Sequence, residues 1–229
     1  MDIHGLQKMT LLDYPGRVAC TVFLGGCDLR CPFCHNSELI DGTAKPVMDS
    51  AELLSFLKKR QGLLDGVAIT GGEPLLRDLT PLLTEIRALG YPVKLDTNGF
   101  HPDRLEQLLT QHLVDYVAMD VKNSPARYAE TVGLPSVDLA PVYASIALLR
   151  DGETDYEFRT TVIDELHDVD AFPAIGEMIR GAKRYFLQPF TDRETVVFSG
   201  LHAPSAEKLK RCEAAVRPYV SAVSVRGDG

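Results

Sequence analysis

Short β-branched runs and amphipathic helical stretches alternate along this chain, and the alternation strongly limits the folds open to it. Strands are expected at 17–24, 65–70, 92–98, 116–121, 156–162 and 185–190, with a weaker one at 221–226. Helical patterns lie at 49–62, 76–90, 101–113, 140–152, 170–182 and 203–219. Strands that alternate with helices form parallel sheets with helices outside. We therefore predict an α/β fold, a partial, open (β/α)6 TIM-type barrel of parallel strands.

Composition narrows the class of protein. The 229 residues contain no Ser/Gly/Pro-rich linker, so we expect a single domain over 1–229. The formal net charge of −8 opposes binding to the phosphate backbone of nucleic acids. No apolar run approaches the roughly 18 residues of a membrane span, and the first residues show no secretion signal. We expect a cytoplasmic protein that binds neither nucleic acid nor membrane.

Each unusual motif of the chain follows directly on an expected strand. Cys27 comes three residues after the first strand, and the next three strands are followed or closed by "TGGEP" (70–74), "DTNG" (96–99) and "MDVK" (119–122). Working residues of parallel α/β sheets gather at the carboxyl ends of the strands. These motifs are therefore expected at one functional edge.

The loop "GGCDLRCPFCHN" (25–36) carries three cysteines in the spacing C-x3-C-x2-C. Cys27, Cys31 and Cys34 could hold three corners of an iron–sulfur cubane and leave the fourth iron open. A zinc site that adds His35 would make two adjacent residues ligands, which is sterically awkward, and no second pair of ligands accompanies it. The C-x-x-C-H spelling also fits haem attachment, but that reading leaves Cys27 unexplained. Iron–sulfur chemistry is the favoured interpretation.

The two remaining cysteines fit packing roles. Cys20 alternates with Val18 and Val22 inside a strand, where a buried apolar thiol is more typical than a fourth cluster ligand. Cys212 lies in a helical pattern far along the chain. We expect both to be buried and outside the site.

The cysteine spacing, followed by Gly-Gly-Glu after the next strand, resembles the signature of radical S-adenosylmethionine enzymes. "GCDLRCPFCHN", "TGGEP", "LDTNG" and "MDVK" are similar to motifs of the enzymes that activate glycyl radical enzymes. The opening "GLQKMTLLDYPGRVACTVFLGGCDLRCPFCHN" most resembles the activating proteins of anaerobic ribonucleoside-triphosphate reductases. The resemblance spans roughly residues 5–190.

The resemblance implies one [4Fe–4S] cluster on Cys27, Cys31 and Cys34, with S-adenosylmethionine chelating the open iron. One electron from the reduced cluster then splits the cofactor into methionine and a 5′-deoxyadenosyl radical, which takes a hydrogen atom from a glycine of a partner enzyme. No further cysteine run follows Asn36. A flavodoxin or ferredoxin is therefore expected to supply the electron.

The resemblance also implies a cofactor-binding set. Gly71, Gly72 and Glu73 would receive the methionine ammonium, although a plain turn that opens a helix at Glu73-Pro74 would look the same. Asp120 and Lys122 would meet the ammonium and the carboxylate of the methionine, unless they form a strand-end salt bridge.

The remaining members of the set are weaker analogies. Phe33, Cys34 and His35 lie where relatives contact adenine, although Phe33 could simply pack. Arg159 has counterparts near the ribose and carboxylate, or it is a structural ion pair. Asp96, beside Thr97, would help to bind a monovalent cation. Val121 completes the expected cofactor-binding set.

Two other functions compete with activation of a glycyl radical enzyme. A small-molecule radical enzyme such as a 7-carboxy-7-deazaguanine synthase has a similarly short chain and a similar core. An iron–sulfur electron carrier would need neither Gly-Gly-Glu nor Asp-x-Lys. The C-P-F-C-H-N spelling favours the activating enzyme.

Overall fold

The computed structural model describes residues 1–41 and 43–227. The chain divides into two compact units. The first unit comprises Met1–Asp28, Glu38–Thr97 and His101–Val117, and the second comprises Leu29–Ser37, Asn98–Phe100 and the chain from Ala118 onward. A single domain over 1–229 stays a prediction.

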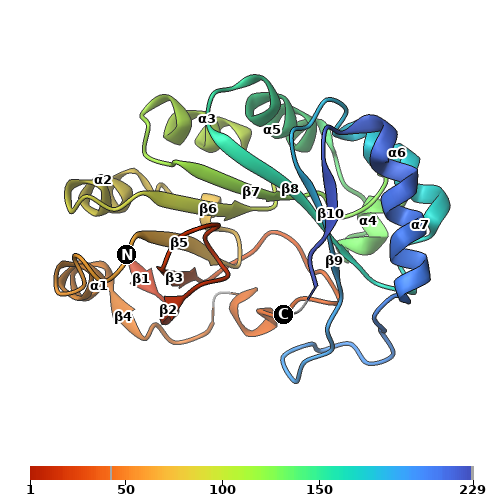
Figure 1. Ribbon diagram of the computed structural model, residues 1–229. Coiled ribbons are helices and arrows are strands. Elements are labelled where there is room, and N and C mark those ends of the chain that lie inside the picture. Colours follow the sequence, from red (N-terminus) through yellow and green to blue (C-terminus); the bar gives the residue numbers. More distant parts are fainter. Residues whose placement is uncertain (42, 228–229) are drawn as a thin grey trace. The chain divides into compact units, whose positions relative to one another are not determined.

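The first unit is built on four strands in the order β6-β5-β3-β2. Strand β2 (Gly5–Thr10) runs antiparallel to β3 (Ala19–Leu24), while β3, β5 (Gly66–Gly71) and β6 (Val93–Thr97) run parallel. A separate small ladder joins β1 (Asp2–Ile3) to β4 (Met48–Asp49). Figure 1 shows α1 (Ser50–Lys58) and α2 (Thr80–Ala88) outside these strands, and α3 (Pro102–Thr110) completes the helices of this unit.

Local sequence signals explain how α1 forms. Asp49 caps the helix in a capping box with Glu52, and Leu53 and Leu57, four residues apart, form its buried face. The helix ends at Lys58, four residues before Gly62, where the sequence pattern had placed its end. Gly62 instead has a positive φ of 80° in the following turn.

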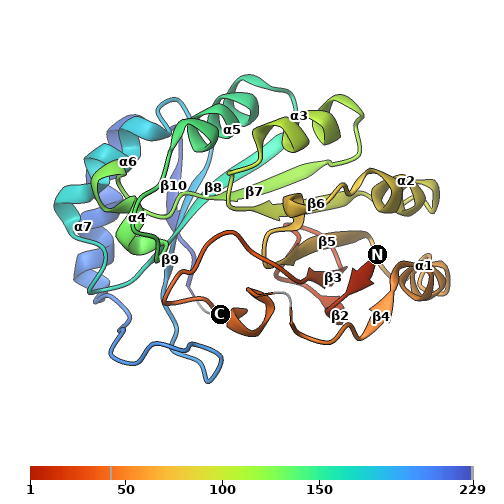
Figure 2. The ribbon, with the colours of Figure 1, turned by 180° about the vertical axis from the view of Figure 1, so that it is seen from behind.

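The second unit holds strands in the order β10-β9-β8-β7, and in it β10 and β8 both run parallel to β9. Its strands are β8 (Asp155–Val162), β9 (Tyr185–Pro189) and β10 (Val223–Val225), and β7 (Tyr116–Asp120) begins in the first unit and ends in the second. Its helices are α4 (Tyr128–Thr131), α5 (Ala140–Asp151), α6 (Phe172–Met178) and α7 (Ala206–Val216). Figure 2 shows α6 and α7 side by side in this unit.

The α/β fold of mostly parallel strands that we predicted is confirmed. All seven expected strands are present, as β3 and β5 to β10. The prediction missed β1, β2 and β4 and the short helix α4, because β2 is an edge strand with three exposed residues and the others are only two to four residues long. The pattern over 76–90 becomes helical only at Thr80, because Pro74–Leu76 forms a separate 3₁₀ helix.

Two smaller expectations concern burial and membranes. Cys20 and Cys212 are both fully buried, as expected for packing thiols. Over the described part of the chain, no helix has the length and apolar character needed to cross a membrane.

Candidate active site

In the first unit, the beginning of the cysteine loop lies against the Gly-Gly-Glu segment. Leu24 and Gly71, the last residues of β3 and β5, are register partners, so both segments leave the sheet at the same level. The Gly72 amide donates to the Leu24 carbonyl (2.8 Å), and the Glu73 amide donates to the Gly26 carbonyl (2.7 Å). The Cys27 amide in turn donates to the Ile40 carbonyl (2.9 Å). The backbone that leads to Cys27 is therefore held from two sides.

The two glycines are required by this close packing. A Cβ on Gly72 would lie 2.0 Å from the Gly26 carbonyl oxygen, and a Cβ on Gly71 would lie 2.3 Å from that of Leu24. Gly71 also has a positive φ of 122°. The atoms that exclude a side chain belong to the protein's own backbone. The two glycines are therefore needed to pack the Gly-Gly-Glu segment against the start of the cysteine loop, independently of any role in cofactor binding.

Glu73 is buried, and its Oε1 accepts from the Leu75 amide and the Thr97 hydroxyl (both 2.9 Å). The first bond caps the 3₁₀ helix Pro74–Leu76. Such a turn, opening a helix at Glu73-Pro74, was the sequence-based alternative to a cofactor-binding role. Both donors are neutral groups, and they fix the orientation of the carboxylate.

Asp96 forms an ion pair with Lys94, two residues earlier on the same face of β6. Lys94 is only 2% exposed, and a buried ammonium needs a charged partner. The structure thus gives Asp96 a positive partner of the chain's own, at the place where the resemblance implies a monovalent cation. An added cation would have to displace or share this ammonium, so the site does not fit the ion well, and the cation stays a prediction.

In the second unit, Asp120, Lys122 and Arg159 form one ion-paired cluster. Lys122 Nζ lies 2.8 Å from Asp120 Oδ2, and Arg159 Nε lies 3.0 Å from Asp120 Oδ1. Burial opposes charge on Asp120, but Arg159 and Lys122 outweigh it and lower the pKa of the carboxyl to about 2. Burial likewise opposes charge on Lys122, and Asp120 overcomes it and raises the pKa of the ammonium. The structure therefore shows the strand-end salt bridge between Asp120 and Lys122 and the ion pair of Arg159, which were the sequence-based alternatives to cofactor binding.

The rest of the cysteine loop packs beside this cluster of charges. Phe33 belongs to an apolar core with Ile163, Leu166 and Phe190, against which Cys31 packs. Lys122 Nζ lies 5.9 Å from the centroid of the Phe33 ring. Burial raises the pKa of the Cys31 thiol to about 11, while the positive charge of Lys122 acts in the opposite direction. The same burial raises the pKa of Cys34.

The last two residues of the set have structural partners of their own. His35 stacks on Phe190 (5.8 Å between ring centroids), and its Nε2 lies 2.7 Å from the Thr191 carbonyl. Val121 is fully buried, and its amide donates to the Arg159 carbonyl (2.8 Å). The second unit thus brings together Cys31, Phe33, Asp120, Lys122 and Arg159 around one region.

The chemistry of the region fits a thiolate-bound cluster. Cys31 and Cys34 are half-buried thiols, and the nearby Lys122 ammonium favours their deprotonated form, although burial outweighs it while no metal is bound. The hydroxyl of Tyr128 is fully buried and makes no hydrogen bond of normal geometry among the described residues, although the Lys122 backbone lies near enough to oppose the rise in its pKa that burial causes. Such an orphaned polar group suits a site that gains a partner from a bound group.

The complete cysteine set draws on both units. Cys27 belongs to the first, with Gly71, Gly72, Glu73 and Asp96, whereas Cys31 and Cys34 belong to the second. Neither unit by itself, among the residues described, gathers three or more His, Cys, Asp or Glu side chains as a metal site. The three-cysteine ligand set therefore stays a prediction.

Three polar residues were not identified from the sequence, although the structure places them beside the expected ones: Lys94, Tyr128 and His167. A lysine inside a strand that is otherwise buried was a signal for Lys94. The other two are defined by contacts between distant segments, which no local pattern reveals.

An α/β sheet of mostly parallel strands, with a three-cysteine loop, Gly-Gly-Glu and Asp-x-Lys at strand ends, defines the class of cluster-bearing enzymes that use such a loop for radical chemistry. The pattern of the Radical SAM superfamily matches residues 21–171. The chain belongs to this superfamily and is a radical SAM enzyme. Membership implies a [4Fe–4S] cluster and S-adenosylmethionine as its cofactors.

Three relatives show the range of functions near this chain. It is 27% identical to a Methanocaldococcus jannaschii protein provisionally named as a glycyl-radical enzyme activating enzyme, over 98% of this chain and 95% of that one. It is 29% identical to the pyruvate formate-lyase-activating enzyme of Listeria monocytogenes (82% and 81% covered). It is 30% identical to the 7-carboxy-7-deazaguanine synthase of Hyperthermus butylicus (78% and 71% covered).

Solved structures share the fold. TYW1 with a lysine-pyruvate adduct matches with a TM-score of 0.64 at 14% identity, over 89% of this chain and 74% of that one. Streptococcus suis SuiB bound to S-adenosylmethionine matches with a TM-score of 0.66 at 14% identity, over 91% and 52%. The structural similarity establishes the partial-barrel fold class. At such low sequence identity it says nothing about the substrate.

Proposed function

We propose that this radical SAM enzyme activates a glycyl radical enzyme by generating a radical on a glycine of that partner. The similarity to an activating enzyme over nearly the whole of both chains supports the proposal most directly. The likeness to pyruvate formate-lyase-activating enzymes adds to it. A flavodoxin or ferredoxin is the proposed electron donor, and the cytoplasm the proposed location.

The partner that we propose is an anaerobic ribonucleoside-triphosphate reductase. The support comes from residues 5–36, "GLQKMTLLDYPGRVACTVFLGGCDLRCPFCHN", which cover β2, β3 and the cysteine loop. This stretch most resembles the activating proteins of those reductases. A formate-lyase-like enzyme would present a similar glycine loop and is the alternative partner.

In this proposal Cys27, Cys31 and Cys34 hold the cluster. The cluster, once bound and reduced, supplies the electron that splits S-adenosylmethionine and yields a hydrogen-abstracting radical. The Lys122 ammonium would pair with the methionine carboxylate, because Asp120 already fixes its position. Asp120 and Glu73 would face the methionine ammonium as oriented carboxylates. Phe33 would offer a stacking face to the adenine.

The decisive experiment is anaerobic. Reconstituted, reduced enzyme is mixed with S-adenosylmethionine and a candidate reductase, and the glycyl radical is recorded by electron paramagnetic resonance. We expect a radical signal with the wild type and with the control variant Cys212→Ala, and none with Cys34→Ala. Absence of a radical on the reductase and on a formate-lyase-like enzyme alike would contradict the proposal.

A second candidate, 7-carboxy-7-deazaguanine synthesis, has one observation in its favour: the 30% identity to the Hyperthermus butylicus enzyme. It predicts turnover of a pterin substrate by the same reconstituted protein without any protein partner. Supplying that substrate in a parallel reaction separates the two functions, because an activating enzyme leaves it unchanged.

A further inference from the structure

The segment that follows β8 carries a histidine with no exposed surface, His167. Its Nδ1 lies 3.1 Å from the Ile163 amide nitrogen, and its Nε2 lies 2.8 Å from the Lys122 carbonyl oxygen. A backbone amide only donates and a carbonyl only accepts, so Nδ1 is the bare acceptor and Nε2 carries the hydrogen. The geometry thus fixes one neutral tautomer of the imidazole.

The carbonyl that His167 binds belongs to a backbone that is held at three groups over two residues. The Val121 amide donates to the Arg159 carbonyl (2.8 Å), and the Val121 carbonyl accepts from the Thr160 hydroxyl (2.5 Å). The Lys122 carbonyl, the third group, accepts from His167. The first two partners are in β8, and only the third depends on a single side chain outside any strand.

Lys122 is therefore fixed at both of its ends. Its ammonium bonds to Asp120 (2.8 Å), and its carbonyl bonds to His167 (2.8 Å). The carbonyl lies next to the Cα from which the four-carbon chain starts, so a shift of this backbone would displace the base of the side chain that carries the ammonium. The imidazole thus holds the backbone carbonyl of Lys122, whereas Asp120 holds its ammonium.

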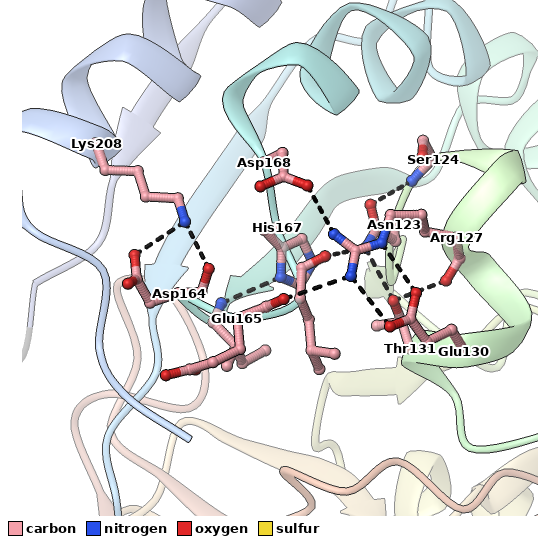
Figure 3. Close-up of polar contacts among 12 residues, drawn as sticks. Asn123, Ser124, Arg127, Glu130, Thr131, Asp164, Glu165, His167, Asp168 and Lys208 are labelled. Atoms are coloured by element: carbon pink, nitrogen blue, oxygen red, sulfur yellow. Dashed lines mark hydrogen bonds and ion pairs between the residues drawn. The ribbon is translucent and has the colours of Figure 1, made fainter. Parts of the chain in front are cut away.

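Other contacts hold the segment of His167 in place without it. Figure 3 shows His167, on the segment after β8, beside Asn123 and Arg127. Asn123 Nδ2 donates to the Leu166 carbonyl (2.8 Å), and Arg127 Nη1 pairs with Asp168 (2.9 Å). On the other side Lys208 Nζ pairs with Asp164 (2.9 Å). Loss of the imidazole alone should therefore leave these segments attached.

We propose that His167 is a positioning residue: through the Lys122 carbonyl, its Nε2–H sets the place of the Lys122 ammonium for binding of S-adenosylmethionine. The inference rests on the proposed role of Lys122 in holding the methionine carboxylate. A histidine that only satisfies its own buried ring nitrogens would make the same two hydrogen bonds, so the two interpretations differ in whether loss of the donor weakens cofactor binding and whether a glutamine restores it. Glutamine keeps an N–H at a similar reach, whereas leucine keeps only the bulk.

The test compares four variants: His167→Gln, His167→Leu, Lys122→Met and Arg127→Met. S-adenosylmethionine is titrated into each reconstituted enzyme without oxygen, and the dissociation constant is read from the change in the cluster's paramagnetic resonance signal. We expect His167→Leu and Lys122→Met to raise this constant about tenfold or more, and His167→Gln to stay within about threefold of the wild type. Arg127→Met breaks a tie between the same segments and should leave the constant unchanged.

The outcomes separate the inference from the proposed function. If Lys122→Met binds the cofactor normally, the proposed role of Lys122 fails. If Lys122→Met weakens binding but His167→Leu does not, or if Arg127→Met weakens it as much as His167→Leu, the positioning role is overturned. Nitrogen-15 spectra of the cluster-free wild type give an independent readout, since a protonated Nδ1 on His167 at neutral pH would also overturn it, even if His167→Leu failed to fold.

Discussion

The amide of Glu73 donates to the carbonyl of Gly26, 2.7 Å away, and so ties the Gly-Gly-Glu segment to the residue before Cys27. The motif that is expected to receive the cofactor is thereby also the support of the cysteine loop. Substitutions in one are expected to disturb the other, which makes the loss of metal a sensitive readout of damage to Gly71, Gly72 or Glu73.

Gly72→Ala should destabilise the protein and impair iron loading, because the added Cβ would lie 2.0 Å from the Gly26 carbonyl oxygen. Overpacking against backbone costs about 2 kcal/mol or more of the free energy of unfolding. Denaturant unfolding and the iron content after reconstitution measure the two effects. Gly227→Ala is the matched control, since a Cβ there meets nothing within 4 Å. Equal behaviour of the two variants would show that the close approach does not matter.

Replacing any one of Cys27, Cys31 and Cys34 by alanine should abolish assembly of a [4Fe–4S] cluster. The predicted site has only these three thiolate ligands, so each variant would leave a second iron without a protein ligand. Cys212→Ala should keep it, as this thiol is buried in α7. Iron content and the absorption spectrum after anaerobic reconstitution report the outcome. A full cluster in Cys27→Ala would mean that the ligand set is wrong.

Tyr128→Phe should leave the cluster-free protein as stable as the wild type, or more stable. The hydroxyl it removes is buried and makes no hydrogen bond of normal geometry among the described residues, so little that is favourable is lost with it. Tyr185→Phe is the matched control, because the equally buried Tyr185 hydroxyl donates to Thr160 (2.6 Å). That variant should lose about 1 kcal/mol in denaturant unfolding. A similar loss in both would show that Tyr128 has a partner after all.

His167 should make the fold sensitive to mild acid. Burial lowers its pKa to about 4, and the positive charges of Arg127 and Lys208 act in the same direction. The unfolded chain binds a proton at this histidine below about 6.5, while the folded protein does not until about pH 4. The stability that it contributes, roughly 3 kcal/mol, is therefore complete above pH 6.5 and is lost as the pH falls toward 4.

Denaturant unfolding of the cluster-free protein between pH 4 and 7.5 measures this loss. His167→Gln should flatten the dependence, because glutamine does not titrate. His202→Gln is the control: His202 is exposed and its pKa is raised by Glu165, so its removal should leave the acid-side loss in place. An unchanged slope in His167→Gln would assign the acid sensitivity to other groups.

The sequence predicted strands such as β3, β5 and β8 because each is a run rich in β-branched or aromatic residues that the fold largely buries. The signal for β10 was weaker, and this strand is mostly exposed. Strand β2 was not predicted, because this edge strand has three exposed residues and lacks a run of β-branched and aromatic residues. The motif residues were identified by their spacing after strands. Their partners were not, because Lys94 on Asp96, Thr97 on Glu73 and His167 on Lys122 are side-chain contacts that only folding creates.

Strand β3, which leads into the cysteine loop, lies between β2 and β5, with Val22 paired to Leu6 on one side and Ile69 on the other. The hydrogen bonds of interior strands break rarely, so the sheet, and not bound iron, holds the strand that leads into the cysteine loop. An enzyme whose cluster is destroyed by oxygen would then keep its scaffold, and the cell could restore it by supplying iron and sulfide again instead of synthesising a new chain.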